Sequence, residues 1–226
     1  MIVRDPPYEL VALFADLDAK VFFEQLIERG QQSGCLRPFR WLSLRDSRRD
    51  TVWRSPQSAL APLHRKGCRL FLSWDLAGSG AEDDGPDRTE EHARTELGRS
   101  SIPREDILTA CFEPELEKVL GVVWGRVKEV VAGVRDQPPP DDARILAKAR
   151  IGSNLRGVHD VHDLLRRAPK EIFEGLLAAM QLRSKADLFE RLGRNLSIPA
   201  LKQDSTMNVV ASRLAEWFPG PGSACF

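Results

Sequence analysis

The sequence is poor in cysteine and lacks long apolar runs. Its four cysteines form no Cys-x-x-Cys pair, which argues against a zinc ribbon and against a disulfide framework. The N-terminal residues contain no signal-peptide core, and no stretch approaches the roughly 18 apolar residues that a membrane span needs. We therefore expect a cytoplasmic protein with free thiols and no membrane segment.

The sequence also lacks an excess of charge of either sign. Its 33 Lys and Arg residues balance 33 Asp and Glu residues, so bulk electrostatics do not predict a general nucleic-acid or membrane binder. A local basic patch is still compatible with this balance. The chain has no P-loop and no GxGxxG, GxSxG or HExxH motif, which argues against the nucleotide, hydrolase and zinc-protease sites that these motifs mark.

What the first half does contain is a series of short, continuous apolar runs, each ending at acidic or glycine-containing residues: 9–15, 68–74 and 106–112. Runs that are apolar on both faces are typical of central strands in a parallel sheet. Segments with helical periodicity follow them, at 18–30, 90–100 and 114–134, and 41–56 adds an extra strand or a hairpin. This alternation predicts an α/β fold with a mainly parallel sheet flanked by helices.

A proline-rich segment divides the chain. Three consecutive prolines at 138–140 exclude helix and central strand, and the sequence beyond them carries only amphipathic helical stripes. We therefore predict an α/β domain over 1–135, a linker over 136–144, an all-helical C-terminal extension or cap over 145–218, and a flexible tail over 219–226.

Acidic residues follow each of the three apolar runs: Asp16 and Asp18, then Asp75, then Glu113, Glu115 and Glu117. The carboxyl ends of parallel strands meet at one rim of a sheet, where such folds bind ligands. Carboxylates that converge there suit Mg²⁺, which takes oxygen ligands and commonly binds phosphate as well. The pattern thus indicates metal-dependent phosphoryl transfer.

We predict that Mg²⁺ or Mn²⁺ is bound by Asp16, Asp18, Asp75, Glu113 and Glu117, with Asp16, Asp75 and Glu113 catalytic. Glu113 and Glu117 are four residues apart and can share a helix face, whereas Glu115 cannot join them. Each acid taken alone is better explained as a helix cap or as a partner of the helix dipole, so the metal site rests on the three strand ends taken together.

A basic segment lies between the first two of these runs. Arg45, Arg48, Arg49 and Arg54 are predicted to contact nucleic-acid phosphates, with an ordinary solvated surface as the alternative.

Three segments resemble the acidic motifs of Toprim-like proteins: YELVALFADLDAKVFFEQLIERG, RLFLSWDLAGSG and LTACFEPELEKVLG. That family includes primases, topoisomerases and nucleases of the overcoming-lysogenization-defect type. The resemblance implies a Toprim-like domain over 1–135 that holds Mg²⁺ between its carboxylates.

The C-terminal sequence PKEIFEGLLAAM, SKADLFERLGRNLSIPAL and RLAEWF makes the whole chain similar to a small component of bacterial methylation-associated anti-phage defence systems. This resemblance implies antiviral defence, partners encoded in the same defence gene cluster, and DNA or RNA as substrate. Three hypotheses follow: a metal-dependent nuclease, a non-catalytic Toprim-like scaffold or sensor subunit that binds other defence proteins, and a small-molecule phosphoesterase.

Overall fold

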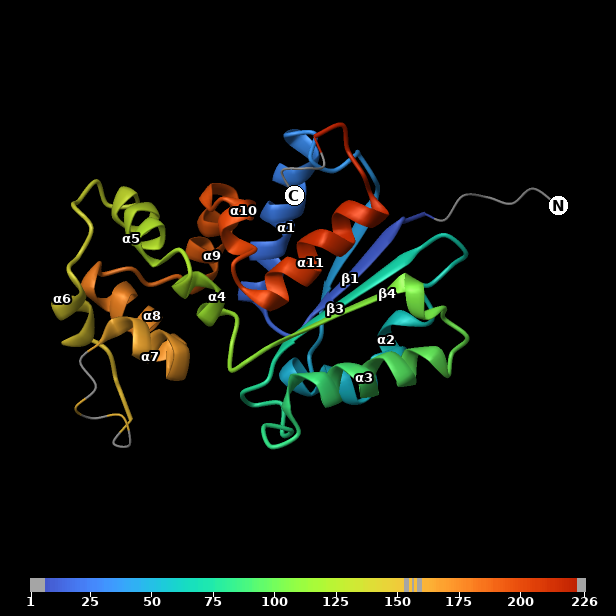
Figure 1. The fold of residues 1–226 in the computed structure, drawn as a ribbon, viewed down its shortest axis with the longest axis horizontal. Coiled ribbons are helices and arrows are strands. Elements are labelled where there is room, and N and C mark those ends of the chain that lie inside the picture. Colours follow the sequence, from blue (N-terminus) through green and yellow to red (C-terminus); the bar gives the residue numbers. More distant parts are fainter. Residues whose placement is uncertain (1–6, 153–154, 156, 158–159, 223–226) are drawn as a thin grey trace.

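The centre of the molecule is a four-stranded parallel β-sheet with the strand order β2-β1-β3-β4 (Figure 1). The computed structural model describes residues 7–152, 155, 157 and 160–222. The strands are β1 (Leu10–Phe14), β2 (Trp41–Arg45), β3 (Arg69–Asp75) and β4 (Ile107–Phe112). The predicted α/β fold with a parallel sheet is confirmed.

The three apolar runs of the sequence are the strands β1, β3 and β4. Every residue of β1 and of β4 is buried, which explains why these strands are apolar without alternation. The remaining strand, β2, lies at an edge of the sheet, and its residues are half-buried or exposed. Its mixed polar and apolar sequence, Trp41 to Arg45, follows from that edge position.

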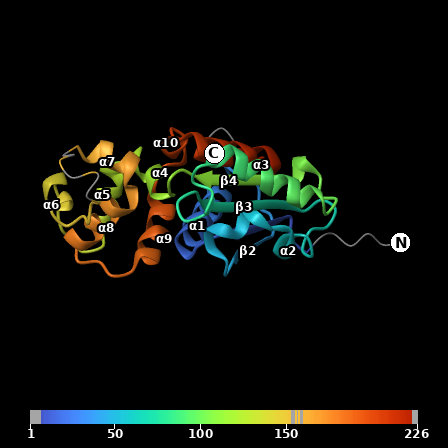
Figure 2. The same cartoon turned by 90° about the horizontal axis from the view of Figure 1, so that it is seen from below.

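Helices cover both faces of the sheet (Figures 1 and 2). On one face α1 (Leu17–Gln32) packs with Phe23 against Phe14 and Phe71. On the other face lie α3 (Gly85–Gly98) and the shorter elements η1 (Arg49–Arg54), α2 (Gln57–Leu60) and η2 (Arg104–Asp106). Since β1 and β3 lead into helices on opposite faces, a crevice is expected between their carboxyl ends.

The second half of the chain is helical, as predicted. The helical segment predicted over 114–134, whose interior glycines weaken a continuous helix, forms two helices, α4 (Glu117–Gly121) and α5 (Trp124–Gly133). They are followed by α6 (Asp142–Leu146), α7 (Val161–Arg167), α8 (Pro169–Ala179), α9 (Lys185–Asn195), α10 (Ile198–Leu201) and α11 (Ser205–Trp217). The short helices α6 and α10 were not predicted, because four or five residues carry too little periodicity.

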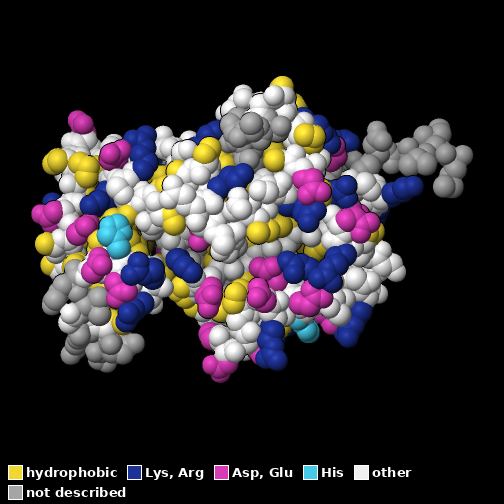
Figure 3. Space-filling model, in the orientation of Figure 1, with side chains coloured by type: hydrophobic (Ala, Val, Ile, Leu, Met, Phe, Trp, Pro, Cys, Tyr) yellow, Lys and Arg dark blue, Asp and Glu magenta, His cyan; other side chains and the backbone are white. Residues whose placement is uncertain are grey.

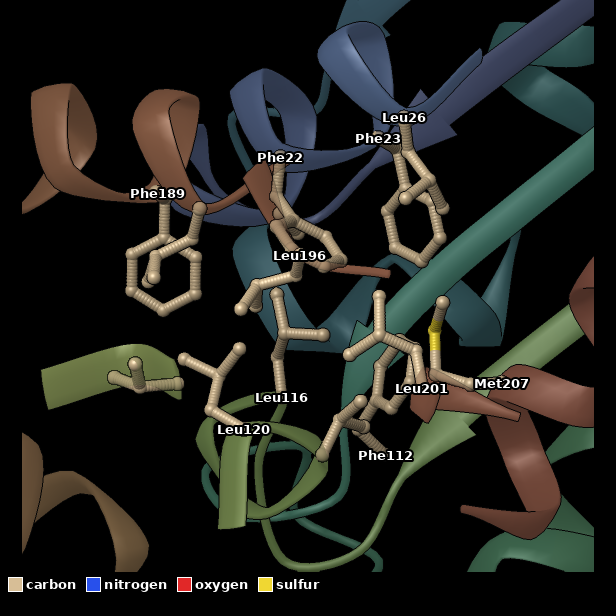
Figure 4. Packing of buried hydrophobic residues seen from close by; sticks show 14 of the residues in the cluster. Phe22, Phe23, Leu26, Phe112, Leu116, Leu120, Phe189, Leu196, Leu201 and Met207 are labelled. Atoms are coloured by element: carbon tan, nitrogen blue, oxygen red, sulfur yellow. The ribbon is translucent and has the colours of Figure 1, made fainter. Parts of the chain in front are cut away.

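The C-terminal helices lie in two separate places. α5 to α8 lie together beyond α4 and α9, away from the sheet, whereas α11 returns across the sheet on the same side as α1 (Figures 1 and 2). A single hydrophobic core joins the two parts, running from Phe112 and Met207 through Phe22 to Phe189 (Figure 4). Phe173 of α8 continues this core beyond Phe189, with ring centroids 5.0 Å apart. The helical extension is therefore continuous with the core of the α/β domain.

Close packing fixes α9 against α1. A Cβ atom at Gly193 would stand 2.5 Å from the carbonyl oxygen of Phe22, so only glycine allows this approach. Phe189 meets Phe22 edge to face, with ring centroids 6.2 Å apart. At the start of α9 the Ser184 hydroxyl accepts the backbone N–H of Asp187 and so caps the helix.

The cysteines differ from the expectation that all are free. Cys35 is disulfide-bonded, whereas Cys68 and Cys111 are free and buried. Cys225 and the end of the predicted tail, 223–226, lie outside the described residues. None of the described helices combines the length and apolarity needed to cross a membrane.

Candidate functional site

The carboxyl ends of β1 and β3 bring Asp16 and Asp75 to one place. The two strands pair in parallel with Phe14 opposite Ser73, and the Ala15 N–H continues the ladder by donating to Ser73 O at 3.0 Å. Asp16 then caps α1 by accepting the N–H of Ala19 at 2.7 Å. The helix therefore begins at Leu17, one residue before the predicted helical segment 18–30.

Backbone hydrogen bonds hold Asp75 between two neighbouring segments. Its N–H donates to Asp50 Oδ1 at 3.2 Å, and its Oδ1 accepts the N–H of Leu116 at 2.9 Å. These bonds tie η1 and the residues before α4 to the end of β3. Glu117, at the first position of α4, is buried.

We call Asp16, Asp18, Asp50, Asp75 and Glu117 the carboxylate cluster. Burial raises the pKa of Asp75 well above its ordinary value, and repulsion from Glu117, Asp16 and Asp50 raises it further. Burial also raises the pKa of Asp16 to about 6, with Asp18, Glu117 and Asp50 adding to the shift. The pKa of Asp50 is raised by burial as well. These acids come from separate segments and repel one another electrostatically.

A lysine from the helical half lies within the cluster. Lys185, the first residue of α9, places Nζ 2.6 Å from Glu117 Oε1 and 3.0 Å from Asp18 Oδ2. The ammonium also lies 5.5 Å from the centroid of the Phe189 ring. Burial alone would lower the pKa of Lys185, but the attraction of Glu117 and Asp18 raises it above its ordinary value. Lys185 therefore stays charged.

Further cations stand at the edge of the cluster. Lys170, near the start of α8, lies 3.6 Å from Glu115, whose pKa is raised by burial and by Glu117. Lys170 and Arg49 both act on Asp50, favouring its charged form and so opposing the effect of burial on its pKa. The site thus combines buried acids with basic groups at its rim.

Of the predicted metal ligands, Asp16, Asp18, Asp75 and Glu117 meet in the cluster, and Glu113 does not share their surroundings. Its side chain is exposed and lines a cavity of about 380 Å³ with residues of α3 and α11. The argument that Glu113 and Glu117 share a helix face is wrong, because α4 begins only at Glu117. Glu113 stays a prediction without that support.

The four predicted arginine contacts divide into two pairs. Arg48 binds the Asp46 carboxylate and Ser55, and Arg54 donates to the carbonyl oxygens of Ser79 and Gly80. Arg45 and Arg49 are exposed and have no ion pair among the described residues. On the face drawn in Figure 3, acidic and basic side chains are interspersed rather than gathered by sign.

Sequence reasoning did not find Asp50, Lys170 and Lys185. Asp50 follows the edge strand β2, whose carboxyl end reaches the same rim, so its place after an alternating segment was a usable signal. Lys185 follows a helix-capping serine, and a cation in a first helical turn is electrostatically unfavourable. That misplaced charge was the sequence signal for an acidic partner elsewhere.

The cluster offers only carboxylate oxygens, which is the donor chemistry that a hard divalent cation requires. Within the described part of the chain, however, no three His, Cys, Asp or Glu side chains stand where they could hold a metal ion together. The carboxylate oxygens are suitable ligands for magnesium. The side chains as they stand, however, bind the ammonium of Lys185, which supplies the positive charge beside Asp18 and Glu117. Loading with a metal would therefore require the side chains to close.

Comparison with protein-family models, with curated proteins and with solved structures finds no match for this chain.

Proposed function

We propose that the carboxylate cluster is a Mg²⁺- or Mn²⁺-dependent site for phosphodiester cleavage, and that the protein acts as a nuclease component of a bacterial anti-phage defence system. The observation that carries the site is the burial of mutually repelling acids at the switch point of a parallel sheet. Strongly perturbed carboxyls in such a place are candidates for function. The defence role rests on the Toprim-like and defence-component resemblances described above.

Asp18, Asp75 and Glu117, with Asp16, would hold the ion. When bound, it would polarise the phosphodiester and a water molecule. The chain's own residues orient the site: Leu116 fixes one oxygen of Asp75, and Ala19 fixes one oxygen of Asp16. Both acids keep a second oxygen for a ligand.

The turn after Asp75 supports phosphate binding beside the cluster. The backbone N–H groups of Gly78 and Gly80 donate to the Glu82 carboxylate at 2.8 and 3.4 Å, and both glycines have positive φ angles. Such a turn is an anion-binding concavity. Exchange of Glu82 for a phosphate oxygen would place a substrate next to Asp75. Arg49, exposed at the rim, would contact the phosphate groups of the same nucleic-acid substrate.

The second candidate function is a non-catalytic scaffold or sensor subunit that binds other defence proteins. The pairing of Lys185 with Asp18 and Glu117 favours it, because a cation of the chain itself already offsets part of the negative charge of these two acids. A small-molecule phosphoesterase shares the metal chemistry of the first proposal and differs in substrate size.

The test is cleavage of labelled single-stranded DNA, duplex DNA and RNA by the full chain with millimolar Mg²⁺ or Mn²⁺. We expect cleavage that EDTA abolishes and that Asp75→Asn lowers by at least about 100-fold, because loss of a group that only orients a metal ligand already costs about 10- to 100-fold and Asp75 is proposed as a ligand itself. The matched control is Asp187→Asn, an exposed acid on α9, which should cleave like the parent chain.

Cleavage of a small phosphodiester alone would assign the protein to the phosphoesterase hypothesis. Absence of all cleavage, together with phage protection that survives Asp75→Asn, would favour the scaffold.

A further inference from the structure

We propose that Lys185 is a built-in counter-ion of the carboxylate cluster, whose ammonium must leave Asp18 and Glu117 before a divalent cation binds there. Lys185 would thereby set how readily the site takes up metal. This inference rests on the proposed metal site and concerns its regulation.

The geometry makes the two cations competitors. The ammonium lies at hydrogen-bond distance from one oxygen of Asp18 and one of Glu117, at 3.0 and 2.6 Å. Magnesium binds carboxylate oxygens at about 2.0–2.1 Å and carries twice the charge. Both cations would seek the space between these carboxylates, and their mutual repulsion excludes joint occupancy of the same oxygens.

The position of Lys185 in its helix indicates what holds it there. It is the first residue of α9, where the positive end of the helix dipole disfavours a cation. The buried Glu117 carboxylate, whose side chain is 4% exposed, offsets this cost. Lys185 is therefore oriented by the acids that we propose as metal ligands rather than by its own helix.

The packing of the molecule defines how Lys185 would leave. α9 is held against α1 by the close approach at Gly193 and by Phe189, so the helix itself is fixed. The Lys185 side chain is 27% exposed, which gives the long flexible stem a route to solvent. Release of the site would thus be a side-chain rotation, with the backbone unchanged.

The test measures Mn²⁺ affinity of the full chain without substrate, by electron paramagnetic resonance of the free ion. We expect Lys185→Gln to bind Mn²⁺ about tenfold more tightly than the parent chain, because a competing ion pair is removed. Glutamine is one atom shorter than lysine but keeps an uncharged N–H donor for Glu117, which protects the fold. Lys170→Gln is the matched control, since Lys170 lies at the same edge but pairs with Glu115, and its affinity should be unchanged.

A second measurement uses the parent chain alone. Mn²⁺ should increase the rate at which acetic anhydride modifies Lys185, read by mass spectrometry, and should leave Lys170 unaffected. Equal Mn²⁺ affinity in the parent and Lys185→Gln chains, with no change in Lys185 reactivity, overturns the inference and leaves the metal site standing. No Mn²⁺ binding to either chain overturns both the inference and the proposed metal-dependent function.

Discussion

Buried acids occur in two kinds of surroundings in this protein. At the amino end of the sheet, Asp106 is bound by the Arg69 guanidinium and lies 3.6 Å from His64. At the carboxyl end, Asp16 and Asp75 face other acids, and the cation Lys185 is ion-paired with Asp18 and Glu117 instead.

The contrast also holds within the carboxyl rim. Asp46 follows β2 there as Asp16 follows β1, but the hydrogen bonds from Arg48 lower the pKa of Asp46, whereas burial raises that of Asp16. A paired acid stabilises the fold in its charged form. An acid among other acids costs stability in its charged form, which makes a role in ligand binding the better explanation.

The largest effect is expected at the amino end, where an arginine is removed from a buried acid. Arg69→Met leaves Asp106, whose side chain is 10% exposed, without its guanidinium. We expect a loss of about 2–3 kcal/mol in the free energy of unfolding, below the full range for a buried pair because Arg69 is partly exposed. Urea unfolding at neutral pH measures it.

The double variant Arg69→Met/Asp106→Asn controls for lost packing, since Arg69 also stacks on Trp217. Removal of the orphaned charge should restore most of the stability. If the double variant is as unstable as Arg69→Met, the stability is lost through packing on Trp217 rather than through the unpaired charge of Asp106. The contrast between a paired acid at the amino end and unpaired acids at the carboxyl end would then be wrong.

In the carboxylate cluster, removal of a charged group should raise the free energy of unfolding rather than lower it. Asn caps helices as well as Asp does, so Asp16→Asn keeps the bond to Ala19 and removes a repelled charge. The folded-state pKa of about 6 lies above the ordinary aspartate value of 3.8, so the contribution of Asp16 to stability is complete below pH 3.8 and is lost as the pH rises through 6. Asp16→Asn should therefore stabilise the chain at pH 8 by about 1–2 kcal/mol, allowing for partial screening.

Urea unfolding at pH 5 and pH 8 checks this prediction, with a smaller gain expected at pH 5. The matched control is Asp204→Asn, which changes the equivalent cap of α11, where Asp204 accepts the N–H of Met207. That change should be nearly neutral at both values. A destabilised Asp16→Asn chain would mean that the cluster is structural.

The sequence could predict the features that leave a local signal along the chain. The strands β1, β3 and β4 were found because burial on both faces leaves an uninterrupted apolar run, which is a local signal. The convergence of Asp16 and Asp75 followed from the rule that parallel strands share a rim. Both inferences need only the order of the elements along the chain.

The partners of the acids could not be predicted in this way. Whether Asp46 is neutralised depends on the turn that folds Arg48 back onto it, and Lys185 reaches Glu117 only because α9 packs against α1. Glu113 and Glu117 seemed equivalent because their spacing suits a helix, but the helix starts too late to include both. Tertiary contacts, rather than local pattern, separate a structural acid from a candidate ligand.

The smallest effect is expected from converting the paired rim acid into an unpaired one. Arg48→Met removes the hydrogen bonds that lower the pKa of Asp46, at a partly exposed site, so the loss should be about 1 kcal/mol at pH 7. Because the folded pKa is depressed, the contribution is present above the unfolded pKa and disappears as the pH falls through the folded one. The difference between parent and variant in urea unfolding should therefore shrink on acidification. At neutral pH it is a loss of stability, whereas the difference caused by Asp16→Asn is a gain. A pH-independent loss would show that Arg48 acts through its bonds to Ser55 instead of through Asp46.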